Sequence, residues 1–119
     1  MKIEDFFDSV GGSYEEVLRR IPSNAIIKKF VMKFGENPSY SEFEKAYLSR
    51  NAEGVFGAAH TIKGVAYNLG FKNLGDKAAE LTEIFRNAEE FPNDSRIDEL
   101  KQELSEAYTE VMSRIALLE

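Results

Sequence analysis

Apolar residues recur along this chain at intervals of three and four positions, the spacing of one face of an α-helix. Over residues 71–89 this stripe consists of Phe71, Leu74, Ala78, Leu81, Phe85 and Ala88. Over residues 94–118 it consists of Ile97, Leu100, Leu104, Ala107, Val111, Ile115 and Leu118. Period-two alternation is never sustained, so β-strands are not expected. The pattern predicts an all-α protein.

Residues that typically begin or end helices divide the rest of the chain. A short helix is expected over 3–9, and further helices are expected to begin after Ser13, Ser23, Ser41 and Asn51. Serine and asparagine favour this position because their side-chain oxygen accepts a backbone N–H of the first turn. Pro38 interrupts the segment that Ser23 opens, and Gly70 ends the segment that Asn51 opens.

Four long elements result, at roughly 23–48 (broken at Pro38), 51–69, 71–90 and 94–118. Short connections favour antiparallel packing of neighbouring helices. We therefore predict an antiparallel up-and-down four-helix bundle over about 23–118, preceded by short additional helices within about 1–22. The whole chain, 1–119, is expected to form a single domain.

The composition of the chain excludes several kinds of functional site and partner. The 119 residues include no cysteine and one histidine, and their formal net charge is −6. A disulfide framework, a cysteine zinc site and a two-histidine metal site are thereby excluded. The acidic balance argues against a nucleic-acid partner. No apolar run approaches a membrane span, and the acidic N-terminus does not resemble a signal peptide, so we expect a cytoplasmic protein.

The single histidine, His60, lies in the segment 51–69. At about 100° per residue, the apolar face of this segment lies opposite His60; that face comprises Val55, Ala58, Ile62, Ala66 and Leu69. The face that carries His60 comprises Glu53, Phe56, Gly57, Lys63, Gly64 and Tyr67. Glycine inside a helix costs about 1 kcal/mol relative to alanine, and exposed aromatic residues often mark an interaction site. The pattern indicates an imidazole that a large partner must reach.

Histidine can itself act as a nucleophile and become phosphorylated. Gly57 and Gly64 would leave room around His60, Lys63 would attract an anion, and an apolar collar would receive the partner. Phosphoryl transfer usually needs a metal ion. Because the sequence shows no metal cluster, the partner would supply it. Two competing interpretations remain. His60 would be an ordinary surface histidine, or the N-terminal segment rather than a partner would cover Phe56 and Tyr67.

The segment Ala59-His60-Thr61-Ile62-Lys63-Gly64-Val65-Ala66-Tyr67-Asn68-Leu69-Gly70-Phe71 resembles the signature of histidine-containing phosphotransfer (HPt) domains. The resemblance implies a four-helix bundle in which His60 accepts a phosphoryl group from a receiver-domain aspartate and passes it to another receiver. It implies that Lys63 lies beside the phosphoryl group and that Gly64 lets the receiver approach. It also implies that Mg²⁺ belongs to the receiver, so this chain is expected to bind no cofactor. Val65 and Phe71 depart from the family's common residues.

The prediction is therefore a histidine phosphocarrier without kinase activity of its own. We expect a free-standing bacterial HPt protein, a monomer whose partners are response-regulator receivers or hybrid histidine kinases. Phe56, Gly57, Gly64 and Tyr67 are the predicted partner contacts. Two alternatives stay open: a receiver-binding or helical interaction module that is not phosphorylated, and the phosphotransfer domain of a chemotaxis-type kinase.

Overall fold

The computed structural model of the chain describes residues 1–118, which form seven helices and no strand. The helices are α1 (Ile3–Ser9), α2 (Tyr14–Arg20), α3 (Asn24–Phe34), α4 (Ser39–Leu48), α5 (Ala52–Asn68), α6 (Lys72–Phe85) and α7 (Arg96–Ile115). The protein is all-helical over this part of the chain, as predicted. None of these helices is both long and apolar enough to cross a membrane.

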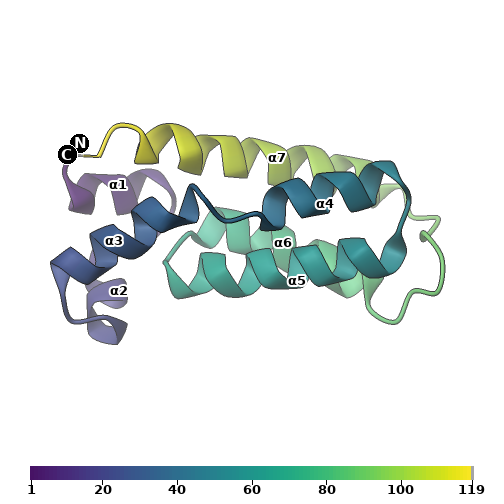
Figure 1. Cartoon of the computed structure of the whole chain (residues 1–119), viewed down its shortest axis with the longest axis horizontal. Coiled ribbons are helices and arrows are strands. Elements are labelled where there is room, and N and C mark those ends of the chain that lie inside the picture. Colours follow the sequence, from purple (N-terminus) through teal and green to yellow (C-terminus); the bar gives the residue numbers. More distant parts are fainter. Residues whose placement is uncertain (119) are drawn as a thin grey trace.

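Helices α4 to α7 lie side by side along the long axis of the molecule (Figure 1). The chain reverses direction at each of the three connections between them (Figure 1). Helix α5 packs against both α4 and α6, and α6 packs against α7. Helices α1, α2 and α3 gather at one end, where α1 also contacts α7. The resulting molecule is elongated, measuring 43 × 24 × 21 Å.

Three of the four predicted helix starts are confirmed by side-chain caps. The oxygen of Ser13 accepts the N–H of Glu16, that of Ser23 accepts the N–H of Ile26, and Asn51 Oδ1 accepts the N–H of Gly54. Each bond satisfies a donor that the first turn of a helix leaves without an intrahelical partner.

The predicted start at Ser41 is wrong. Helix α4 begins two residues earlier, at Ser39. Asn37 Oδ1 accepts the Ser39 N–H at 2.9 Å. The side-chain hydrogen bond at the start of this helix therefore comes from Asn37 and not from Ser41. The break at Pro38 between α3 and α4 is as predicted.

Gly70 terminates α5, as the sequence predicts, and its φ of +78° lies in the left-handed region that favours glycine. The N–H of Phe71 reaches back to the carbonyl of Ala66 at 2.7 Å, a typical helix-ending bond. A Cβ atom on Gly70 would lie 2.6 Å from a methyl carbon of Val17. The turn and the close approach of α2 therefore both require glycine here.

The predicted helix over 71–90 is too long, because α6 ends at Phe85. Arg86 turns to an extended conformation and Asn87 adopts a φ of +58°. The connection that follows folds back, and the ring of Phe91 packs against those of Phe85 and Tyr47 at centroid distances of 5.0 and 5.6 Å. Packing of this half-buried ring favours the loop over a longer helix.

Helix α7 is also shorter than predicted, spanning Arg96–Ile115 rather than 94–118. Asp94 Oδ1 accepts the N–H of Arg96 at 2.8 Å, which places Asp94 outside the helix. The predicted stripe still faces inward, with Leu104 fully buried and Ala107 and Leu118 packed at its edge.

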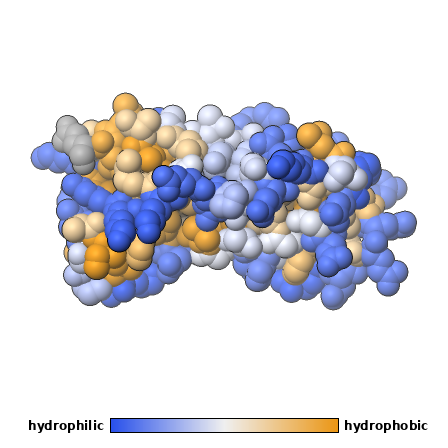
Figure 2. Space-filling view, viewed as in Figure 1, coloured by the Kyte–Doolittle hydropathy of each residue, from blue (hydrophilic) through white to orange (hydrophobic). Residues whose placement is uncertain are grey.

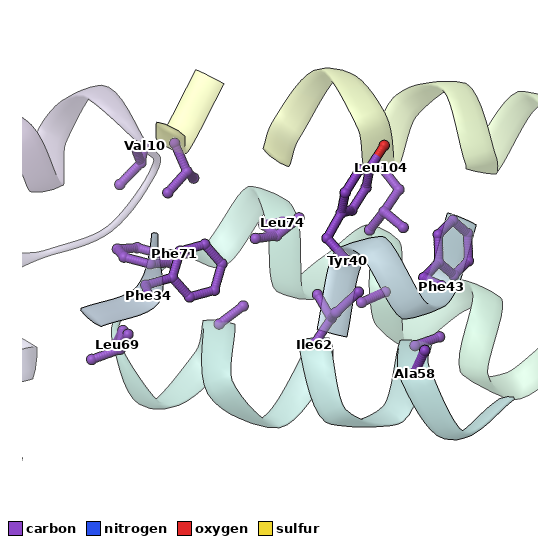
Figure 3. Close-up of a cluster of buried hydrophobic side chains, with 14 of the residues drawn as sticks. Val10, Phe34, Tyr40, Phe43, Ala58, Ile62, Leu69, Phe71, Leu74 and Leu104 are labelled. Carbon is purple, nitrogen blue, oxygen red and sulfur yellow. The ribbon is translucent and has the colours of Figure 1, made fainter. Parts of the chain in front are cut away.

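The buried apolar side chains form one cluster to which each of the seven helices contributes, and Figure 3 shows part of it. Phe71, fully buried, contacts the rings of Phe6, Phe7 and Phe34 at centroid distances of 5.1 to 6.4 Å. It thereby joins α1 and α3 to the start of α6. Near the middle, Tyr40 of α4 stacks on Tyr108 of α7 at 3.9 Å.

Candidate functional site

Helix α5 buries the face predicted from the sequence and presents His60 to solvent. Val55, Ala58, Ile62, Ala66 and Leu69 are all buried, and His60 is exposed. Two alanines outside the predicted face, Ala52 and Ala59, are buried as well. The core side of α5 is wider than its sequence suggested because both α4 and α6 pack against it.

The glycines on either side of His60 border open space. A Cβ atom built on Gly57 or on Gly64 would meet no heavy atom within 4 Å. The surface is hollowed beside each glycine. Gly64 lines a groove of about 550 Å³ between α3 and α5, and Gly57 lines one of about 610 Å³ between α4 and α5. An approaching protein therefore meets no side chain of residue 57 or 64.

Phe56, one turn before His60, packs on the imidazole. The two rings are nearly parallel, with an interplanar angle of 8° and centroids 5.8 Å apart. The guanidinium carbon of Arg86, at the end of α6, lies 5.4 Å from the centre of the Phe56 ring, within the range of a cation–π contact. Phe56 is half-buried, so part of its surface stays open beside the imidazole.

Lys63, one turn after His60, is half-buried and belongs to a group of charges shared with α6. Hydrogen bonds from Arg86 hold the pKa of the Glu83 carboxyl below its usual value, and the positive charge of Lys63 lowers that pKa further. The two bonds from Arg86 to Glu83 measure 3.2 and 2.9 Å. The site thus contains two cations and one carboxylate beside the imidazole helix.

Tyr67 lies apart from this group, two turns beyond His60. Its ring packs over Gly75 of α6, where a Cβ atom would come within 2.5 Å of the ring. Its hydroxyl donates to Asp76 at 2.7 Å. Burial, and then this bond, raise the pKa of Tyr67 to about 12. The side chain is 41% exposed, so it still presents surface to a partner, although α6 fixes its position.

The N-terminal segment reaches the C-terminal end of α5, where Ser13, Glu16 and Arg20 line a hollow together with Tyr67. Arg20 of α2 donates to the backbone carbonyls of Tyr67 and Asn68 at 3.2 and 3.0 Å. A cation at the C-terminal end of a helix is favourable because the last carbonyls have no intrahelical donor.

Glu83 and Arg86 are the site residues that the sequence did not predict. The sequence pattern places both on the exposed side of a long helix, with no sign that they face His60. Their position depends on the register between α5 and α6 and on the end of α6 at Phe85. Their i, i+3 spacing in the sequence predicts an ion pair between Glu83 and Arg86. It does not predict which residues of α5 lie beside that pair.

Within residues 1–118, no group of three or more His, Asp or Glu side chains is placed to hold a metal ion.

The family model described as "Hpt domain" matches residues 40–110, which is more than half of the chain. The chain belongs to the Hpt domain family. Hpt domains carry out histidine phosphotransfer in phosphorelays, and they interact with response-regulator receivers or with kinases. The match extends from the first turn of α4 into the last turns of α7 and contains His60. Helices α1, α2 and α3 lie outside it. No curated protein and no solved structure matches the chain.

Proposed function

We propose that this Hpt domain is a phosphocarrier in which His60 accepts a phosphoryl group from one receiver-domain aspartate and delivers it to another. One observation carries the proposal: the chain's single histidine is exposed on α5, opposite the core, between two glycines that border open space. A nucleophile that must meet another protein's phosphoryl group needs such access, because in-line attack requires the reacting atoms to be about 3 Å apart.

The transfer step balances without a cofactor of this chain. The lone pair of one imidazole nitrogen attacks the phosphorus of the aspartyl phosphate. A P–N bond forms and the P–O bond to the aspartate breaks, so the aspartate leaves as a carboxylate with the bonding electron pair. The other ring nitrogen keeps its proton, which leaves a phosphoimidazolium. In the return step a second receiver's carboxylate attacks phosphorus and the neutral imidazole departs.

The surrounding side chains support this role. Lys63 provides positive charge one turn from His60, where it would stabilise the phosphoryl oxygens. Gly57 and Gly64 provide clearance, and Phe56 restrains the imidazole. We place the receiver's contact surface around these residues, extending to Tyr67. Mg²⁺ and the acidic residues that bind it are expected on the receiver.

The proposal also covers the arrangement of the long helices and the oligomeric state. We infer that α4 to α7 form the antiparallel up-and-down four-helix bundle of the family and that the chain acts as a monomer. The contacts of α5 with α4 and α6, those of α6 with α7, and the Tyr40–Tyr108 stack support the bundle.

The test separates a carrier from a docking module. A receiver is first phosphorylated with acetyl phosphate and freed of the donor, and the chain is then added. Wild type is expected to take up the phosphoryl group, whereas His60→Gln is expected to bind the receiver with similar affinity and take up none. Equal binding by both proteins with no transfer to either would instead establish the unphosphorylated interaction module.

A further inference from the structure

A linked set of side chains extends from His60 to the end of α6. The imidazole packs on Phe56, and Arg86 lies over the same phenyl ring. Arg86 is held in turn by both carboxylate oxygens of Glu83. Lys63 lies near enough to this carboxylate for its charge to lower the Glu83 pKa. In the unphosphorylated protein, one carboxylate therefore attracts both cations of the site.

We propose that Glu83 is a positioning residue that shortens the lifetime of the phosphoryl group on His60, because it holds Arg86 by two hydrogen bonds and its charge attracts Lys63, and these two cations would otherwise stabilise that group. The inference rests on the proposed function. It adds that the charges of this site are set for release of the phosphoryl group rather than for storage.

A phosphoryl group carries about −1.5 to −2 charges near neutral pH, so it competes with Glu83 for Lys63 and Arg86. This competition destabilises the phosphorylated protein relative to the products of transfer or hydrolysis.

Hydrolysis gives a measure of this lifetime that needs no receiver. The oxygen of water attacks phosphorus and the P–N bond breaks, with its electron pair passing to the ring nitrogen. The products are neutral His60 and dihydrogen phosphate, so the phosphoimidazolium and water balance them in atoms and charge.

The experiment compares Glu83→Gln with a matched control, Glu80→Gln. Glu80 lies one turn earlier on α6, but its carboxylate is near Lys77 and Arg96 instead. Each protein is labelled chemically with phosphoramidate and freed of the reagent, and loss of the phosphoryl group is followed by ³¹P NMR. His60→Gln provides the background.

We expect Glu83→Gln to lose the label about threefold more slowly than wild type, a modest effect because these charges are exposed and screened. Glu80→Gln should match wild type. Arg86→Gln should lose the label faster, and Arg86→Lys should restore the wild-type rate in part. At about 1 M salt, where the Debye length is about 3 Å, the difference between Glu83→Gln and wild type should disappear.

Two results would overturn the inference. One is a Glu83→Gln rate equal to or faster than that of wild type. The other is a difference that persists unchanged at high salt, which would indicate a structural effect rather than a charge effect. Failure of every receiver to transfer would refute the proposed function separately, because chemical labelling of His60 does not depend on a receiver.

Discussion

At the scale of single residues, the site is defined as much by missing side chains as by those present. Gly57 and Gly64 each carry the conformational cost of glycine in a helix interior, about 1 kcal/mol relative to alanine. Neither position is crowded, since a Cβ atom at either would contact nothing within 4 Å. Packing within the chain therefore does not require glycine here. In the proposed function, glycine at both positions gives a partner access to His60.

Gly64→Leu would place a large side chain in the open space beside His60. The substitution should leave the fold intact and raise helix propensity by about 0.8 kcal/mol. It should nevertheless slow transfer from a phosphorylated receiver by about tenfold or more, because misplacing the reacting atoms is costly. Thr109→Leu, at an exposed position on α7, is the matched control. A folded Gly64→Leu protein that transfers at the wild-type rate would refute the access argument.

At the scale of elements, the seam between α5 and α6 is fixed by exposed polar contacts as well as by the core. Asp76 of α6 accepts hydrogen bonds from Lys72 and from Tyr67 of α5, at 2.8 and 2.7 Å. The bond from Lys72, followed by that from Tyr67, lowers the pKa of the Asp76 carboxyl from its usual 3.8 despite partial burial. The same pair of helices brings Arg86 of α6 over Phe56 of α5 and Glu83 near Lys63.

The pH dependence of this contact has a definite sign. Because the folded-state pKa of Asp76 is depressed, its stabilising contribution is present above the unfolded-state pKa and is lost as the pH falls through the folded-state value. At neutral pH, Asp76→Asn should be less stable than wild type by about 0.5 kcal/mol, as for an exposed pair. Urea unfolding should show the two proteins converging as the pH falls well below 3.8. A gap that is the same at both pH values would contradict this account.

Local signals explain why most elements could be predicted from the sequence. The caps at Ser13, Ser23 and Asn51 need only neighbouring residues, and so does the helix end at Gly70. The face of α5 that carries His60 follows from helical periodicity in the same way.

Contacts between distant segments explain what could not be predicted. The end of α6 at Phe85 depends on Phe91 packing back against Phe85 and against Tyr47 of α4. The approach of Arg86 to Phe56 depends on how α5 and α6 are aligned. Neither alignment leaves a pattern within a single helix.

At the scale of the whole molecule, the N-terminal helices share one core with the part of the chain that matches the family. Phe71 is the connection, because its ring meets those of Phe6 and Phe7 from α1 and Phe34 from α3. Apolar surface also gathers at the end of the molecule that these helices form (Figure 2), where Ile26, Phe30 and Met32 of α3 are exposed.

The shared core predicts cooperative unfolding and a large penalty for opening it. Phe71→Ala should reduce the free energy of unfolding by about 3–5 kcal/mol, as for other buried phenylalanines. Leu48→Ala is the control, since Leu48 is 81% exposed and such changes usually cost less than about 0.5 kcal/mol. Urea unfolding followed by circular dichroism and by tyrosine fluorescence should give coincident transitions for wild type. A cost for Phe71→Ala similar to that for Leu48→Ala would argue that α1 and α3 are not integral to the core.

The central claim, that His60 carries the phosphoryl group, is tested most directly by locating that group. After incubation with a phosphorylated receiver, the wild-type chain should hold a label that is lost in acid and retained in base, as expected for a phosphoimidazole. Mass spectrometry of peptides at neutral or alkaline pH should place the label on His60, and His60→Gln should acquire none. A label that survives acid, maps to another residue or persists in His60→Gln would contradict the claim.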